Sequence, residues 1–132
     1  MTLLPGTLSR AGLLSSDILD LQVAEHGPDA RVVTVMGEVD ALSAPELATF
    51  LTAQLVAVQV VVVDLADVRF LDSAGLAVLF EVSELAIRED RDLRLVCDSR
   101  SADLALEVTG LREYFAVTET VSAALDNAYL AA

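Results

Sequence analysis

The sequence has no lysine and no tryptophan, and only one histidine (His26) and one cysteine (Cys97). Without lysine it lacks both the cation of a G-x-x-x-x-G-K-[ST] phosphate loop and an amine for Schiff-base chemistry. A single histidine, in a segment typical of a turn, makes a Ser-His-Asp or Cys-His arrangement or a transition-metal site hard to build. Cys97 can form no internal disulfide, and its context, L-R-L-V-C, is typical of a small core residue. We therefore expect no self-contained enzyme, no cofactor and no metal site.

Basic residues are also scarce. Eight arginines face 21 acidic residues, which gives a formal net charge of −13. Phosphate binding needs clustered lysine and arginine, so nucleic acid is an improbable partner. Two explanations of the acidity stay open. It either speeds encounter with a basic protein surface or only keeps a hydrophobic domain in solution.

Long apolar runs are missing, although 55% of the residues are hydrophobic and the mean hydropathy is +0.58. Gln54, Gln59, Asp64 and Asp67 cut the apolar runs well below the ~18–20 residues that span a bilayer. The first 14 residues are interrupted before a secretory signal can form, so we expect a soluble cytoplasmic protein without a membrane partner. At 132 residues, the chain is expected to hold a loosely ordered lead-in at 1–16 and a single domain at 17–132.

Strand and helix patterns alternate along the chain without an internal repeat. Runs of β-branched residues predict strands, and apolar residues at helical spacing predict helices. This order is typical of an α/β fold with a mixed sheet. The expected strands are 19–24, 31–36 (ending at Gly37), 60–65, 93–97 and 115–118, and the expected helices are 43–57, 73–88, 102–108 and 121 onward.

Several helix boundaries carry local signals. Ser43-Ala44-Pro45-Glu46 has the form of a capping box with proline in the first turn. Gly110 is expected to end the third helix, and Thr120 to cap the fourth. In the helix at 73–88, a core stripe is expected from Gly75, Val78, Leu79, Val82, Leu85 and Ala86. For the residues that flank it, we favour a wider buried face over a partner-binding edge: Leu76, Phe80 and Ile87.

The segment V-V-V-V-D-L-A-D-V-R-F-L-D-S-A-G-L-A-V-L (60–79) is the most informative. An apolar strand is followed by Asp72 and Ser73, which open an apolar helix. Free N–H groups and the positive end of the helix dipole favour an anion there, so Ser73 would tolerate phosphorylation. The alternative is that Asp-Ser is only a helix cap, because both residues are preferred at that position.

Acidic residues are expected at the same edge of the sheet. Glu38, Asp40 and Asp72 follow strands that are neighbours in this arrangement, and they are the best carboxylate cluster of the sequence. Such a cluster could perform acid–base chemistry or hold Mg²⁺. Nothing in the spacing demands either, and most acidic residues in such a chain lie on the solvated surface.

Two segments together resemble the STAS family, and within it the bacterial anti-sigma factor antagonists. V-V-T-V-M-G-E-V-D-A-L-S-A-P-E-L (32–47) is similar to the family's strand, G-E-[LIV]-D turn and first helix. V-V-V-D-L-A-D-V-R-F-L-D-S-A-G-L-A-V-L (61–79) is similar to its central strand and phosphorylation turn. The likeness covers roughly residues 19–128. It implies a STAS-type α/β fold, with a mixed β-sheet of four to five strands and helices packed mainly on one face.

The resemblance also implies a function and a site. Ser73 falls on the family's phosphoacceptor, and Ala74 stands where relatives often carry serine or threonine. The implied partners are an anti-sigma factor serine kinase of the histidine-kinase-like ATPase fold and a metal-dependent serine phosphatase. The unphosphorylated antagonist would bind the kinase and free a sigma factor, and phosphorylation would switch it off. The residues expected at the partner surface are Glu38, Asp40, Asp72, Ala74, Gly75 and Leu76.

A second function fits the same resemblance. Some STAS subunits are purely structural, as in lipid-export ABC transporters, where they brace an ATPase without being phosphorylated. The sequence contains no motif that shows whether the chain itself binds a nucleotide.

Overall fold

The computed structural model describes residues 19–131, with side chains through Asp126. The lead-in expected at 1–16 and the domain start expected at 17 lie outside the described residues. Within the described part, no helix is both long enough and apolar enough to cross a bilayer. The elements follow in the order β1 (Leu19–Glu25), β2 (Ala30–Val39), α1 (Ala44–Ala57), β3 (Val60–Leu71), α2 (Ser73–Arg88), β4 (Asp92–Val96), α3 (Arg100–Thr109), η2 (Leu111–Glu113), β5 (Val117–Thr118) and α4 (Val121–Ala131).

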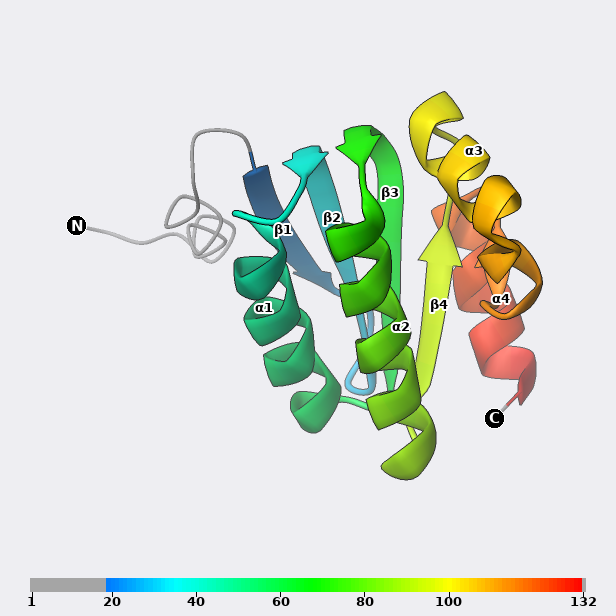
Figure 1. Ribbon diagram of the computed structural model, residues 1–132. Coiled ribbons are helices and arrows are strands. Elements are labelled where there is room, and N and C mark those ends of the chain that lie inside the picture. Colours follow the sequence, from blue (N-terminus) through cyan, green and yellow to red (C-terminus); the bar gives the residue numbers. More distant parts are fainter. Residues whose placement is uncertain (1–18, 132) are drawn as a thin grey trace.

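The five strands form one mixed sheet in the order β1-β2-β3-β4-β5 (Figure 1). β1 and β2 form an antiparallel hairpin, and its turn includes Gly27 at a φ of 78°. All later neighbours pair in parallel, because a helix or helical segment carries the chain back between them. The expectation of a mixed sheet of four to five strands is confirmed.

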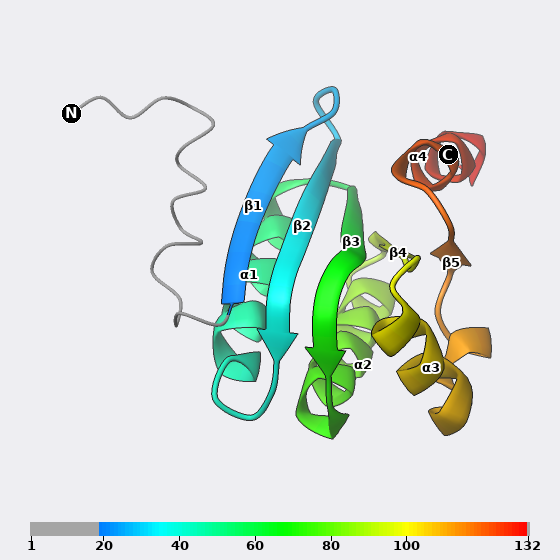
Figure 2. The same cartoon turned by 90° about the horizontal axis from the view of Figure 1, so that it is seen from above.

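Most of the helical mass lies on one face of the sheet. α1 and α2 run side by side there (Figure 1), and their apolar side chains join those of α3 in one core that includes Leu47, Leu79 and Leu106. α4 covers part of the opposite face and packs against Val62 and its neighbours (Figure 2). β3 is therefore buried on both sides, as its uninterrupted valine run predicts.

Two strands are several residues longer than their sequences predict, and β1 is longer by one residue. β3 continues six residues beyond the expected end at Leu65, and β2 passes through Gly37, at a φ of 102°, to reach Val39. The register between them shifts twice, so extra residues of β3 are accommodated as bulges. Asp64 fits such an irregularity because its carboxylate accepts a hydrogen bond from the Ala66 N–H at 3.0 Å. Polar residues therefore do not end the strand.

At the start of α1, the proline lies in the first turn as predicted, but the part of the capping box assigned to Ser43 is wrong. Ser43 precedes the helix, but its backbone is already in the helical region and its hydroxyl caps no helical N–H. The side chain is completely buried and turns back, with its hydroxyl donating to the Glu38 carbonyl at 3.0 Å and accepting from the Asp40 N–H at 3.0 Å. Ser43 closes the turn that precedes α1 instead of capping the helix.

α2 has the predicted bounds, and the predicted stripe faces the core, with Leu85 partly buried. The three flanking residues differ from one another. Leu76 is buried, as a widened face requires, whereas Phe80 and Ile87 are 39% and 65% exposed. The prediction of a wider buried face is therefore right for Leu76 and wrong for the other two.

In the C-terminal elements, the residues predicted to cap or end a helix do so, but the predicted lengths of the elements differ from those in the structure. α3 begins at Arg100, two residues before the prediction, because Ser99 is its N-cap. Gly110 follows it in the left-handed conformation (φ 77°), and the Thr120 hydroxyl accepts from the Ala123 N–H, both as predicted. β4 lies one residue earlier than expected, and β5 contains only Val117 and Thr118.

Candidate functional site

The candidate site lies at the edge of the sheet where β2 and β3 end and α2 begins. Glu38 pairs with Phe70, and Val39 pairs with Leu71, so the two strands end together. The Asp72 N–H donates a hydrogen bond of 3.1 Å to the Val39 carbonyl, which joins the two turns directly. Glu38, Asp40, Asp72 and Ser73 therefore come from segments more than 30 residues apart and share one edge.

Asp72 caps α2. One of its carboxylate oxygens accepts from the N–H groups of Ala74 and Gly75 at 2.9 and 3.2 Å. Asp is among the best residues for this position, because it satisfies N–H groups that have no partner within the helix. The cap fixes the direction in which the helix leaves β3.

Ser73 is the first residue of α2, and its side chain is exposed. No other described residue forms a hydrogen bond to its hydroxyl. Because Asp72 rather than Ser73 supplies the cap, this hydroxyl is available to a reagent from outside. The other interpretation of the sequence is that Asp-Ser is only a helix cap. The structure shows that Asp72 alone provides the capping side chain.

Asp40 organises the turn between β2 and α1. Its Oδ1 accepts from the N–H groups of Leu42 and Ser43, each at 3.0 Å. The side chain stays partly exposed beside Leu42, which is 82% exposed. Asp40 thus has a structural role in the turn and also leaves part of a carboxylate at the surface.

Gly75 allows α2 to approach the sheet closely. A Cβ atom at this position would lie 2.6 Å from Leu71 Cδ1 and 2.7 Å from Val39 Cγ1, which are the last residues of β3 and β2. Only glycine fits there without displacing a neighbour. Among the residues expected at the partner surface, Gly75 and Leu76 are thus buried, while Ala74 is partly exposed.

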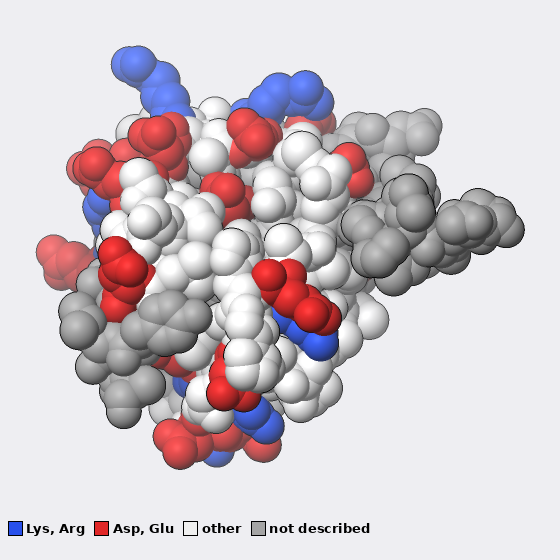
Figure 3. All heavy atoms as spheres, turned by 180° about the vertical axis from the view of Figure 1, so that it is seen from behind, with Lys and Arg blue, Asp and Glu red and all other residues white. Residues whose placement is uncertain are grey.

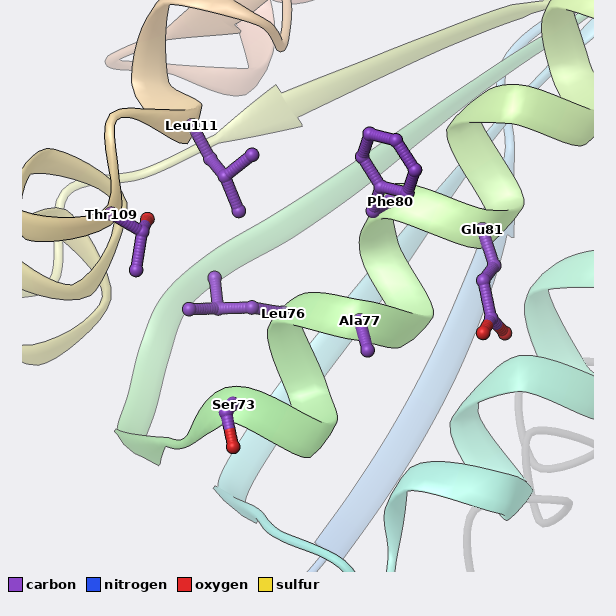
Figure 4. Close-up of a pocket in the computed structure, with 7 residues that line it drawn as sticks. All are labelled: Ser73, Leu76, Ala77, Phe80, Glu81, Thr109 and Leu111. Atoms are coloured by element: carbon purple, nitrogen blue, oxygen red, sulfur yellow. The ribbon is translucent and has the colours of Figure 1, made fainter.

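A shallow groove of about 340 Å³ extends from Ser73 along α2 (Figure 4). Its walls come from α2 and from the end of α3 with η2, and most of its lining is apolar. Phe80 stands at the far part of the groove, and its ring lies 5.0 Å from that of Tyr114, centroid to centroid. The lining residues are Ser73, Leu76, Ala77, Phe80, Glu81, Thr109 and Leu111.

Sequence reasoning missed this groove and the role of Ser43. Thr109 and Leu111 lie near a helix stop signal, and nothing in their local pattern indicates that they face α2. Ser43 lies in a recognisable capping-box motif. That motif predicts a hydrogen bond to a helical N–H, whereas the Ser43 hydroxyl donates to the Glu38 carbonyl.

A family model of the STAS domain matches residues 22–124. The chain belongs to the STAS domain family. An anti-sigma factor antagonist from Mycobacterium paratuberculosis has a similar structure, with a TM-score of 0.77 and 28% identity over 86% of this chain and 97% of that one. The unphosphorylated form of the antagonist SpoIIAA matches at a TM-score of 0.70 and 16% identity, over 83% of this chain and 96% of that one.

The phosphorylated form of SpoIIAA, described as a Bacillus cell fate determinant, is also similar to this STAS domain. It matches at a TM-score of 0.63 and 16% identity, over 82% of this chain and 98% of that one. At 16% identity, the SpoIIAA structures support the STAS fold alone. The fold expected from the two sequence segments is confirmed.

The residues around Ser73 of this STAS domain offer little catalytic chemistry. His26 lies in the β1–β2 turn, at the opposite end of β2 from the candidate site. In the described part of the chain, no group of three or more His, Cys, Asp or Glu side chains is arranged to hold a metal ion. Burial, with a further contribution from the Asp103 charge, raises the pKa of the Cys97 thiol to about 11, as befits a core residue. The site presents the exposed Ser73 hydroxyl at the edge that also carries the carboxylates of Glu38, Asp40 and Asp72.

Proposed function

We propose that this STAS domain is an anti-sigma factor antagonist that is switched by phosphorylation of Ser73. The observation that carries the proposal is the exposed Ser73 hydroxyl on the first turn of α2, free of hydrogen bonds to other described residues. The similarity to an anti-sigma factor antagonist, at 28% identity over most of both chains, supports the same function.

The unphosphorylated protein is the binding form in this proposal. Its partner is an anti-sigma factor, a serine kinase of the histidine-kinase-like ATPase fold, which releases a sigma factor when the antagonist binds. Glu38 and Asp40 offer carboxylates to basic groups of that partner, and Asp72, Ala74, Gly75 and Leu76 shape the turn that presents Ser73. The groove beside Ser73 offers apolar contact to a side chain of the same partner.

Phosphorylation then ends the interaction. The kinase transfers the γ-phosphoryl group of ATP to Ser73 Oγ, with loss of the hydroxyl proton and release of ADP. The phosphate adds about −1.5 to −2 charges to an edge that is already acidic. Within this protein, the N-terminus of α2 stabilises the new charge, so the fold survives. Across the interface, repulsion and desolvation weaken docking, and a loss of ~3 kcal/mol lowers affinity roughly a hundredfold.

A reset step completes the proposed cycle. A metal-dependent serine phosphatase removes the phosphate, which restores the binding form. Access to the phosphoserine requires an exposed position, and Ser73 is exposed. This STAS domain supplies no catalytic group of its own to either step.

Incubation with ATP and the anti-sigma serine kinase of the same organism tests the proposal. Intact-mass spectrometry should show one added phosphate on the wild type and none on Ser73→Ala. The matched control is Ser122→Ala, because Ser122 is also exposed and also lies in the first turn of a helix, α4. This variant should be phosphorylated like the wild type. A phosphate that persists on Ser73→Ala would overturn the assignment of the acceptor.

A further inference from the structure

Three arginines of the described chain have guanidinium groups without an ion pair or a hydrogen bond to another described residue. The other arginines are engaged: Arg31 with Glu25, Arg94 with Asp92, Arg112 with Asp103, and Arg91 with the Val58 carbonyl. The unengaged ones are Arg69, Arg88 and Arg100, and all three are exposed.

The fold brings the backbone segments that carry two of these, Arg69 and Arg100, close together. Gly37 pairs with Val68 and Glu38 pairs with Phe70, so Arg69 is the extra residue of a bulge at the end of β3. Ser99 caps α3, and its hydroxyl donates a hydrogen bond of 2.6 Å to the Val68 carbonyl. Arg69 follows Val68 and Arg100 follows Ser99, so each arginine is the next residue after one of the two partners in this hydrogen bond.

This arginine pair, Arg69 and Arg100, lies at the same edge of the sheet as Ser73. β3 leads through Asp72 into Ser73, and α3 begins at that edge after β4 (Figure 1). From behind, basic side chains project from this upper edge of the molecule at two separate places, with acidic side chains below them (Figure 3). Arg88 ends α2 and therefore lies at the opposite end of that helix from Ser73.

The charge of the arginine pair is unusual in its surroundings. The chain carries a formal charge of −13, yet Arg69 and Arg100 form no ion pair with a described carboxylate, including Asp98 beside Ser99. A surface guanidinium group without an ion pair attracts an anion from outside the protein. Guanidinium groups bind carboxylates through paired N–H donors, so a carboxylate fits both in charge and in geometry.

We propose that the arginine pair is a docking point for carboxylate side chains of the anti-sigma partner, an inference that rests on the function proposed above. The edge around Ser73 then carries both signs of charge, with Glu38 and Asp40 over β2 and the arginine pair over β3 and α3. A partner must meet the first with basic groups and the second with acidic groups. The reversed orientation places like charges together, so the pair fixes the direction of docking on Ser73.

Charge reversal at each arginine tests this proposal. The variants are Arg69→Glu and Arg100→Glu, and the matched control is Arg88→Glu, which reverses another exposed and unengaged arginine. Calorimetry with the anti-sigma kinase at low salt should show at least a tenfold rise in Kd for each of the first two variants. Arg88→Glu should stay within twofold of the wild type. Added salt should narrow the difference, because screening weakens exposed charge pairs.

The outcomes separate this inference from the proposed function. If the wild type binds the kinase and the three variants bind equally well, the docking point is refuted while the antagonist function stands. If the wild type binds no anti-sigma factor, both the docking point and the antagonist function are refuted. Circular dichroism checks the fold of each variant. Should a charge reversal unfold the protein, Arg69→Gln and Arg100→Gln carry the test, with an expected threefold or larger rise in Kd, and unchanged affinity would again refute the docking point.

Discussion

At the scale of single residues, Asp40 and Asp72 combine a structural and an electrostatic role. Each uses one carboxylate oxygen to accept two backbone N–H groups, in a turn for Asp40 and at a helix cap for Asp72. Asparagine keeps such an acceptor oxygen and removes only the charge. The two roles can therefore be separated by experiment.

We predict that Asp40→Asn and Asp72→Asn affect the switch more than the fold. Each should lower the free energy of unfolding by at most ~1–2 kcal/mol, the range of a lost cap, because the acceptor remains. Binding to the kinase or the rate of phosphorylation should fall more steeply, because the negative charge that faces the partner is gone. Urea denaturation and a phosphotransfer assay measure the two effects. Unfolding of Asp40→Asn, or unchanged phosphotransfer, would contradict the role assigned to Asp40.

At the scale of elements, local signals predicted much of the fold. α2 has the predicted bounds because a cap, an apolar stripe and an unbroken helical period agree. β3 was predicted too short, because Asp64 and Asp67 interrupt the apolar pattern and the pairing register with β2 cannot be read from one strand. The α1 cap failed for a related reason. Ser43 had two possible sets of partners, and tertiary packing selected the set in the preceding turn.

The candidate site, like the fold, has one part that the sequence predicts and another part that it does not. Asp40, Asp72 and Ser73 follow strand ends and Glu38 lies one residue before the end of β2, and parallel strands bring their ends to one edge. The groove and the arginine pair depend on contacts between α3 and earlier elements, such as the bond between Ser99 and Val68. No local pattern in the sequence reports a contact over 31 residues.

The close packing of α2 on the sheet yields a second prediction at this scale. Gly75→Ala should destabilise the domain, although alanine is the better helix former by about 1 kcal/mol. The new methyl group would lie 2.6 and 2.7 Å from atoms of Leu71 and Val39, and overpacking of this kind costs about 1–3 kcal/mol. Urea denaturation measures the change. A gain in stability would show that helix propensity, not close packing, governs this position.

At the scale of the whole molecule, the net charge of −13 bears on how the switch works. An acidic surface of this kind attracts basic partners from many directions and selects no single orientation. Docking must therefore be controlled at one specific turn. Ser73 lies in such a turn, at the N-terminus of α2, where a change of its charge does not require the fold to change. The proposed signal is one local charge on a surface that is otherwise constant.

The phospho-mimic Ser73→Asp tests this argument and separates the antagonist from a structural brace of a transporter ATPase. The helix N-terminus accepts a carboxylate readily, so the circular dichroism spectrum should stay native. The added negative charge lies at the contact itself, so calorimetric affinity for the kinase should fall at least tenfold. Ser122→Asp adds the same charge to the first turn of α4 and should bind within twofold of the wild type. A structural brace that contacts its ATPase elsewhere has no reason to respond to one charge at Ser73. Equal affinities of the wild type and Ser73→Asp would therefore favour the brace and count against the antagonist.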